Sequence, residues 1–151
     1  MWLLDKLRDV AGKNILDLGC GEGVLTRELA RRGALVTAVD LDEDALVRSA
    51  KLCMVEELPV CHFIRDSADL DGFADNSSDA VLCSMMLMDC ADPAGTVREA
   101  ARVLKPGGIL HVTLPCDCRG SESYLQMVLQ AGLTVVKRET TNCRQYFALR
   151  K

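Results

Sequence analysis

The chain has 151 residues, 49% of them hydrophobic, and a formal net charge of −4; this fits one domain and leaves no room for a second core. An acidic balance without a long basic run argues against nucleic-acid binding, which relies on clustered lysine and arginine. The longest apolar stretch, residues 80–88, is too short to span a bilayer, and charges interleaved through the first nine residues exclude a secretion signal. We therefore expect a cytoplasmic protein that makes no membrane contact.

The first half of the chain is expected to alternate helices and strands. An amphipathic helix is expected within residues 1–12, because its apolar residues share one helical face: Trp2, Leu3, Leu4, Leu7 and Val10. After it we expect a strand at 14–18, a glycine loop at 19–23, a helix at 24–32, a strand at 35–39, a helix at 42–52, a strand at 60–64 and an irregular segment at 66–78.

The second half continues the alternation, beginning with a strand at 80–83. Asp92 and Pro93 predict the N-cap and the first residue of a helix that continues to Leu104. A strand at 109–114, a helix at 121–131 and two strands at 133–140 and 145–149 complete the pattern. Strands that alternate with helices and are apolar on both faces predict a parallel sheet covered on each side, a three-layer α/β sandwich. Ligands of such sheets bind at the carboxyl ends of the strands.

Eight cysteines are present, and Cys53, Cys61 and Cys83 stand inside apolar runs. In a reducing compartment such residues are expected to be small core residues with free thiols. Cys116 and Cys118 come closest to a paired arrangement, but a structural zinc site needs a second pair. We expect no bound metal.

A glycine-rich loop follows the strand at 14–18. Gly19, Gly21 and Gly23 allow the backbone to turn tightly and to approach a ligand at the start of a helix. A dinucleotide-binding loop would carry its third glycine one residue later, where Val24 stands. Asp17 precedes the loop within the strand, where a carboxylate is costly to bury unless a cation or a set of donors meets it. An ammonium group of a ligand would serve, and so would the amides of the loop itself.

Further acids follow the next two strands. Asp40 ends the second strand and can accept hydrogen bonds from both hydroxyls of a ribose, while Leu41 beside it can lie against an adenine face. Asp66 and Ser67 follow the third strand, where a carboxylate can accept from the adenine amino group and an amide can donate to a ring nitrogen. For Asp66 taken alone, the alternative is an ordinary turn aspartate. The recurrence of such groups at successive strand ends is what indicates a nucleotide site.

These motifs resemble those of class I S-adenosylmethionine-dependent methyltransferases. The resemblance rests on four segments: NILDLGCGEG at 14–23, VDL at 39–41, RDSA at 65–68 and RVLKPGG at 102–108. It implies a seven-stranded sheet in the order 3-2-1-4-5-7-6 with strand seven antiparallel. It also implies that S-adenosylmethionine lies with its methionine part over Gly19, Cys20 and Gly21, and that the Cys83 carbonyl accepts from its ammonium group.

The chain departs from the family in having no evident lid over the acceptor pocket. Such enzymes usually carry a lid before the first strand or after the fifth. Here we expect one domain over 1–151, formed by an N-terminal helix at 1–12, a cofactor-binding core at 14–114, and a C-terminal helix and strand pair at 115–151. The acceptor pocket is then shallow, or is closed either by the N-terminal helix or by a second copy of the chain in a homodimer.

Few residues are candidates for the chemistry itself. Asp89, after the fourth strand, is the best candidate for orienting an acceptor, whereas His62 and His111 fall in apolar strands and are expected to be buried and hydrogen-bonded. A soft apolar wall of Met85, Met86 and Met88, or a contact from Tyr124, is a weaker alternative.

We predict methyl transfer to an unidentified acceptor, most simply a small molecule. A catalytically silent partner that binds S-adenosylmethionine, or a protein or RNA methyltransferase, is the alternative. A nicotinamide-dependent oxidoreductase is disfavoured by the displaced glycine.

Overall fold

The computed structural model describes residues 2–116 and 121–151. Its elements follow in the order β1 (Asn14–Leu18), α1 (Val24–Arg31), β2 (Leu35–Asp40), α2 (Glu43–Val55), β3 (Val60–Ile64), β4 (Ser78–Ser84), α3 (Pro93–Val103), β5 (Leu104–Pro115), α4 (Ser121–Gln130), β6 (Thr134–Thr140) and β7 (Arg144–Arg150). From Asn14 onward these elements agree in type and order with the sequence prediction, and their ends differ by a few residues. No helix in the described part of the chain is long and apolar enough to cross a membrane.

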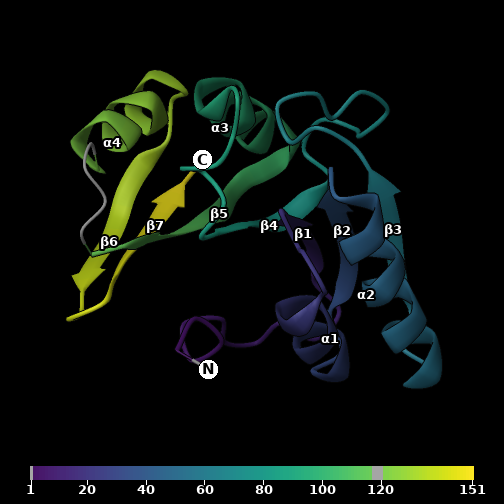
Figure 1. The fold of residues 1–151 in the computed structure, drawn as a ribbon. Coiled ribbons are helices and arrows are strands. Elements are labelled where there is room, and N and C mark those ends of the chain that lie inside the picture. The colour runs from purple at the N-terminus through teal and green to yellow at the C-terminus, as the bar shows by residue number, and fades with distance from the viewer. Residues whose placement is uncertain (1, 117–120) are drawn as a thin grey trace.

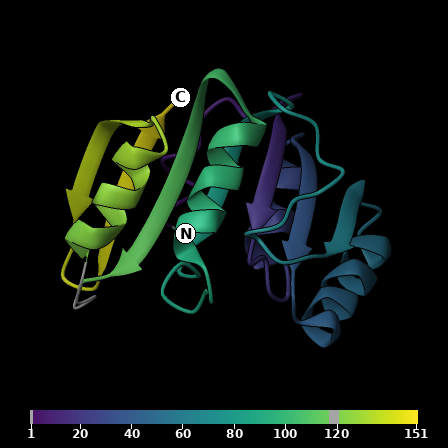
Figure 2. The ribbon, with the colours of Figure 1, turned by 90° about the horizontal axis from the view of Figure 1, so that it is seen from above.

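All seven strands form one sheet in the order β3-β2-β1-β4-β5-β7-β6. The five strands β1 to β5 are mutually parallel, while β7 lies antiparallel between β5 and β6. Figure 1 shows α3 and α4 on one side of this sheet and α1 and α2 on the other, and Figure 2 gives the same arrangement from above. The predicted three-layer α/β sandwich and its strand order are therefore confirmed.

Capping residues explain where two helices begin. The Asp92 carboxylate accepts a hydrogen bond from the Gly95 amide at 2.8 Å, and Pro93 occupies the first helical position of α3, as predicted. Asp42 caps α2 in the same way by accepting from the Ala45 amide at 3.0 Å. These caps start both helices directly after loops at the carboxyl edge of the sheet.

Alternating strand residues fill two hydrophobic clusters, one on each face of the sheet. In β1, Ile15 packs on the α1 side, whereas Leu16 and Leu18 pack on the α3 and α4 side. In β4, Leu82 and Val81 divide in the same way. Because both faces are buried, the central strands are apolar at consecutive positions.

The N-terminal segment is not the predicted helix. Residues 2–6 form turns, in which the amides of Lys6 and Leu7 donate to the carbonyls three residues earlier, Leu3 and Leu4. The apolar side chains are nevertheless buried, with Leu4 only 2% exposed, and they pack with α1 and the middle of the sheet. The apolar pattern thus identified a buried segment correctly, but the apolar side chains are buried by turns and not by a helix. Because it packs on this face, the segment does not fold over the carboxyl edge.

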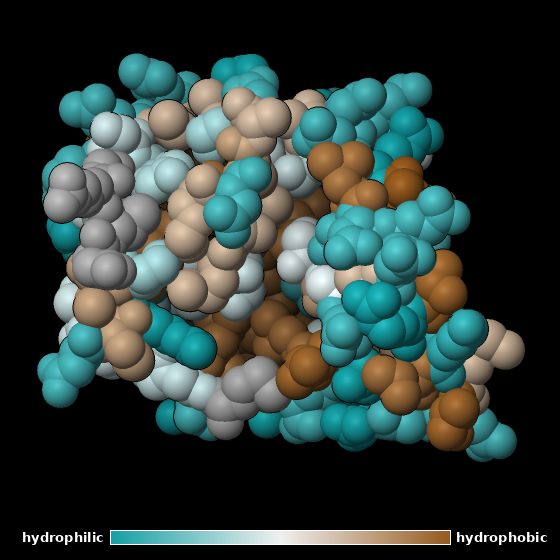
Figure 3. Space-filling view, in the orientation of Figure 1, coloured by the Kyte–Doolittle hydropathy of each residue, from teal (hydrophilic) through white to brown (hydrophobic). Residues whose placement is uncertain are grey.

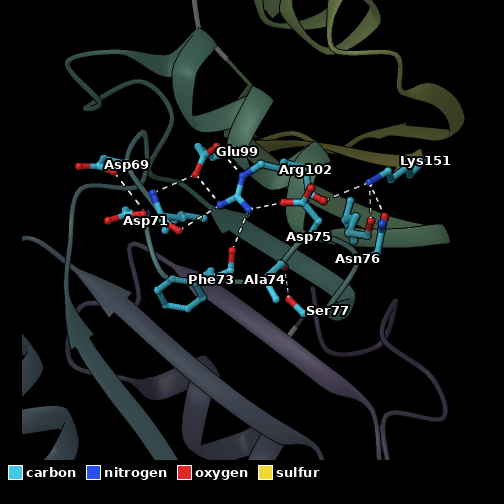
Figure 4. Close-up of polar contacts among 12 residues, drawn as sticks. Asp69, Asp71, Phe73, Ala74, Asp75, Asn76, Ser77, Glu99, Arg102 and Lys151 are labelled. Atoms are coloured by element: carbon cyan, nitrogen blue, oxygen red, sulfur yellow. Dashed lines mark hydrogen bonds and ion pairs between the residues drawn. The ribbon is translucent and has the colours of Figure 1, made fainter.

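The guanidinium group of Arg102 makes several of the hydrogen bonds that hold the irregular segment between β3 and β4, alongside Glu99, which accepts from the Leu70 amide at 3.0 Å. Arg102 of α3 donates to the carboxylates of Glu99 and Asp75 and to the carbonyls of Leu70 and Phe73, at 2.6 to 3.0 Å (Figure 4). The two carboxylates raise the pKa of Arg102 above its usual value. This connection contains no helix, and its Phe73 ring contacts the ring of Phe63 in β3 edge to face.

The outer edge of the sheet, at β3, and the end of α2 beside it carry exposed apolar side chains. Figure 3 shows hydrophobic surface on the side of the molecule where α2 and β3 lie, and the exposed side chains there include Met54, Val55, Phe63 and Ile64. Cys61, which was expected in the core, is exposed as well. Its strand pairs only with β2, so an apolar sequence context did not imply burial.

Candidate functional site

The loop after β1 turns through three glycines with positive φ, Gly19, Gly21 and Gly23, at 66°, 54° and 72°. A Cβ atom at Gly19 would lie 2.7 Å from the Cβ of Met86, and one at Gly23 would lie 2.0 Å from the Ser49 hydroxyl oxygen. A Cβ at Gly21 would meet no heavy atom within 4 Å. Two of the glycines are therefore needed for packing as well as for conformation, and only the middle one faces open space.

Asp40 is fixed at the end of β2 by two backbone amides. Its Oδ2 accepts from the Gly21 amide at 2.7 Å, and its Oδ1 accepts from the Asp42 amide at 2.9 Å. The amides of Gly19 and Cys20 donate to the Val39 carbonyl at 2.8 and 3.2 Å, which ties the glycine loop to the same strand end. The carboxylate predicted to bind a ribose is thus held rigidly beside the loop.

Asp17 is almost completely buried beneath the loop, at 2% exposure. Its Oδ2 accepts a hydrogen bond of 2.6 Å from the hydroxyl of Thr26 in α1. Burial raises the pKa of Asp17 to about 6; the Thr26 hydrogen bond opposes this rise and the charge of Asp40 adds to it. Burial also raises the pKa of the Cys20 thiol, so this side chain is a neutral member of the loop.

The turn after β3 presents one exposed and one buried side chain. Asp66 folds back so that its Oδ1 accepts from the Ala68 amide at 2.9 Å, and its side chain is exposed. The Ser67 hydroxyl is buried and lies 2.8 Å from the hydroxyl of Thr96 in α3. Leu41, after β2, is 65% exposed, which leaves its apolar surface free for a ligand.

A cavity of about 440 Å³ lies at the carboxyl edge of the sheet, a size typical of small-molecule sites. Six predicted site residues line it: Gly19, Asp40, Leu41, Asp66, Ser67 and Asp89. The remaining wall comes from Val39, Arg65 and the segment after β4, and it includes Ser84, Met85, Met86, Cys90 and Ala91. Arg65, which belongs to the RDSA segment, and Cys90, which follows Asp89, were not predicted as site residues but also line the cavity.

Four predicted residues do not line the cavity. Asp17 lies beneath the cavity in β1, and Cys20 and Gly21 lie beside it in the glycine loop. Cys83 is paired with Leu18 and Val112 in the centre of the sheet, and its side chain is fully buried. Only its main chain is available for the role that the family resemblance gives it.

The segment after β4 holds both apolar and acidic groups. Met85 adopts a φ of 61°, which is rare for a residue with a side chain, and its amide donates to the Thr113 carbonyl at 3.0 Å. Asp89 is exposed, and its amide donates to the Met86 carbonyl at 3.0 Å. The turn thus places an ionisable side chain and two thioethers at the same cavity.

Both histidines are engaged elsewhere, as predicted. The Nδ1 atom of His111 lies 2.8 Å from the Tyr146 hydroxyl, and burial lowers the pKa of His111 to about 4. The Nε2 atom of His62 lies 3.0 Å from the Ser49 hydroxyl, and burial lowers its pKa as well. Neither residue lines the candidate cavity, so neither is placed to act as a base there.

A second hollow of about 480 Å³ lies at the opposite edge, between the N-terminal segment and the start of β5. Because ligands of open α/β sheets bind at the carboxyl ends of the strands, the smaller cavity is the candidate site. Within the described residues, all seven cysteines are free thiols, and no group of three or more potential ligands is placed to hold a metal. Cys118 lies outside the described residues.

Taken together, the strand order, the glycine loop and the acid at the end of β2 define the class I S-adenosylmethionine-dependent methyltransferase fold. The sequence profile of the methyltransferase domain matches residues 16–112, well over half of the chain. The chain therefore belongs to this family of methyltransferase domains, whose methyl donor is S-adenosylmethionine.

Curated relatives include two ubiquinone biosynthesis O-methyltransferases. The protein of Xanthomonas oryzae pv. oryzae is 42% identical over 106 residues, which cover 70% of this chain and 44% of that protein. The protein of Alkalilimnicola ehrlichii is 38% identical over 145 residues, covering 93% and 57%. The chain thus spans about half the length of these relatives.

Two solved structures show the same fold. The S-adenosylmethionine-dependent methyltransferase from Mesorhizobium loti has a TM-score of 0.87 at 18% identity, covering 99% of this chain and 96% of that one. The [4+2]-cyclase SpnF has a TM-score of 0.90 at 21% identity, covering 99% and 78%. At these identities the likeness concerns the fold alone.

Proposed function

We propose that this chain transfers a methyl group from S-adenosylmethionine to an oxygen atom of a small molecule. The observation that carries the proposal is the cavity at the carboxyl edge, where Gly19, Asp40 and Asp66 meet in a chain related to O-methyltransferases. The domain organisation we propose is a cofactor-binding core at 14–114, followed by a C-terminal part at 115–151.

The residues fit the methyl donor, which supplies an electrophilic methyl group on a sulfonium. Asp17 is buried and negative when ionised, which suits it to the cofactor ammonium group, together with the Cys83 carbonyl. Asp40, held by two amides, would accept from the ribose hydroxyls without reorganising. The adenine would lie against Leu41, with Asp66 and Ser67 at its edge; the methionine part would lie over Gly19, Cys20 and Gly21.

Alignment is the main task left to the protein, because the sulfonium already supplies the driving force. Asp89 reaches the cavity from the turn after β4 and would orient an acceptor hydroxyl or take its proton. Met85 and Met86 in the same turn would keep water from the line of transfer and would not compete as hydrogen-bonding groups.

The cavity is open toward solvent, and the N-terminal segment packs on a face of the sheet instead of covering it. Of the two closures considered above, a second copy of the chain is therefore the one we propose. Sedimentation at micromolar concentrations should then give a dimer, whereas a monomer with full turnover would contradict this part of the proposal.

Calorimetry with S-adenosylhomocysteine, followed by transfer of labelled methyl from S-adenosylmethionine to a panel of phenols and catechols, tests the function. We expect micromolar affinity, about −8 kcal/mol at 1 μM, and transfer to at least one hydroxyl. Tighter binding of a nicotinamide dinucleotide would refute the cofactor assignment. Binding without transfer to any member of the panel, or to protein or RNA, would instead indicate a silent partner subunit.

A further inference from the structure

Thr26 and Asp17 form a buried pair beneath the glycine loop. Thr26 is the third residue of α1, is completely buried, and donates its hydroxyl proton to Oδ2 of Asp17 at 2.6 Å. This distance is typical of a hydrogen bond to an ionised carboxylate, which is shorter and stronger than one between neutral groups. The Thr26 hydroxyl is therefore committed to one oxygen of Asp17.

The other oxygen of Asp17 has a different environment. Within the described residues, Oδ1 accepts no hydrogen bond, although the side chain is only 2% exposed. Oδ1 retains contact with solvent, because Nε of Arg27 is the only fully buried side-chain nitrogen or oxygen without a partner among the described residues. A donor or a cation that reaches Oδ1 from the solvent side improves the pairing of this largely desolvated carboxylate. The unpaired oxygen lies at the end of β1, directly before the loop that closes one side of the candidate site.

We propose that Thr26 is a positioning residue for the cofactor ammonium group: its hydroxyl holds Oδ2 of Asp17 and leaves Oδ1 as the acceptor for the ligand. This inference rests on the proposed function. A threonine suits the role, because its branched Cβ restricts the side chain to few rotamers inside a helix. The carboxylate is thereby prevented from rotating, so that the ligand meets an acceptor already in place.

The charges around Asp17 explain why a single hydroxyl matters. Asp40, from β2, raises the pKa of Asp17, as burial does, and the thiols of Cys20 and Cys83 are neutral groups whose own pKa values are raised by burial. Among the described residues, the Thr26 hydroxyl is the group that favours the ionised form. Without it, more of the population would be protonated near neutral pH and unable to attract an ammonium group.

Thr26→Val removes the hydroxyl while keeping shape and branching, and Thr26→Ser restores it. Calorimetry from pH 5.5 to 8.5 should use two ligands: S-adenosylhomocysteine, which carries the ammonium group, and 5′-methylthioadenosine, which lacks the whole amino-acid part. For Thr26→Val at pH 7 we expect about tenfold weaker binding of S-adenosylhomocysteine and an unchanged affinity for 5′-methylthioadenosine, within about twofold. The pH at which S-adenosylhomocysteine binding is half lost should move upward by about one unit.

Thr26→Ser should bind within about threefold of the wild type, with the original pH midpoint. Equal loss of both ligands in Thr26→Val would show that the hydroxyl only supports the loop, and would overturn the proposal. Unchanged binding of both would overturn it too. A wild-type chain that binds neither ligand would refute the proposed function itself. This outcome is distinguishable from failure of the Thr26 proposal, because it is read from the wild type alone.

Discussion

Replacing Gly21 by alanine separates the ligand-binding role of the glycine loop from its structural role. Gly21 has a φ of 54°, and an added Cβ would meet no heavy atom within 4 Å. The expected cost to the free energy of unfolding is therefore the backbone cost alone, about 1–2 kcal/mol. For a chain of this length that corresponds to a fall in Tm of about 2–8 °C.

In Gly21→Ala we also expect a loss of cofactor affinity that the loss of folding stability does not account for. The Gly21 amide donates to Asp40, which lines the cavity, and the open space beside Gly21 is where the methionine part of the cofactor is proposed to lie. A methyl group there would hold the ligand away from the backbone. Calorimetry with S-adenosylhomocysteine should give at least about tenfold weaker binding, or 1.4 kcal/mol.

Gly107→Ala is the matched control. Gly107 has a φ of 79°, has no heavy atom within 4 Å of an added Cβ, and lies at the opposite edge of the sheet. It should lose similar stability and keep wild-type affinity. If Gly21→Ala binds as tightly as Gly107→Ala, the glycine loop does not hold the ligand and the reasoning fails.

Two further predictions concern stability. Asp17, with its pKa raised to about 6, binds a proton more tightly in the folded chain, so its contribution to the free energy of unfolding falls by about 2 kcal/mol from pH 4 to 6.5. His111, with its pKa lowered to about 4, contributes a rise of similar size, about 3 kcal/mol, over the same interval. Urea unfolding should therefore show that Asp17→Asn becomes more stable relative to wild type as the pH rises, and that His111→Asn becomes less stable. A change in relative free energy of unfolding below about 1 kcal/mol across this pH interval would contradict the prediction. Arg102→Met should cost about 2–3 kcal/mol, because the Phe73 carbonyl and the Asp75 carboxylate lose their donor and the Leu70 carbonyl keeps only the Phe73 amide. Arg98→Met, which removes only an exposed ion pair on the same helix, should cost less than about 0.5 kcal/mol, and equal losses would refute the role given to Arg102.

The strands and helices of the sheet layers were predictable because their signals are local, whereas the strand order was implied by the family resemblance. Short apolar runs, the Asp92–Pro93 cap and the glycines mark element ends whatever the tertiary structure does. The N-terminal segment was mispredicted because the spacing of apolar residues indicates which positions are buried but not which backbone structure buries them. Here turns bury Leu3 and Leu4 as well as a helix would. Cys61 was wrongly predicted to be buried for a related reason, since the neighbouring residues do not indicate that its strand lies at the edge of the sheet.

The positions of the candidate site residues in the fold were predictable from the sequence, but their hydrogen-bond partners were not. Strand ends are local features, so Asp40 and Asp66 could be placed at one edge from sequence. The hydrogen-bond partners come from other elements: Thr26 reaches Asp17 from α1, and Thr96 takes the Ser67 hydroxyl from α3. Such contacts depend on how helices pack against the sheet, and no spacing rule in one sequence reveals them.

The two halves of the site are tied to the fold to different degrees. On the cofactor side, Gly23 packs against Ser49 and Asp40 is held by two amides, so most changes there disturb the fold and the ligand together. On the proposed acceptor side, Asp89 is exposed, and Met86 of the same turn lies over Gly19 of the loop. Substitutions at exposed positions usually change stability little. The acceptor side can therefore vary while the donor site stays constant, which is why the family defines the methyl donor more firmly than the acceptor.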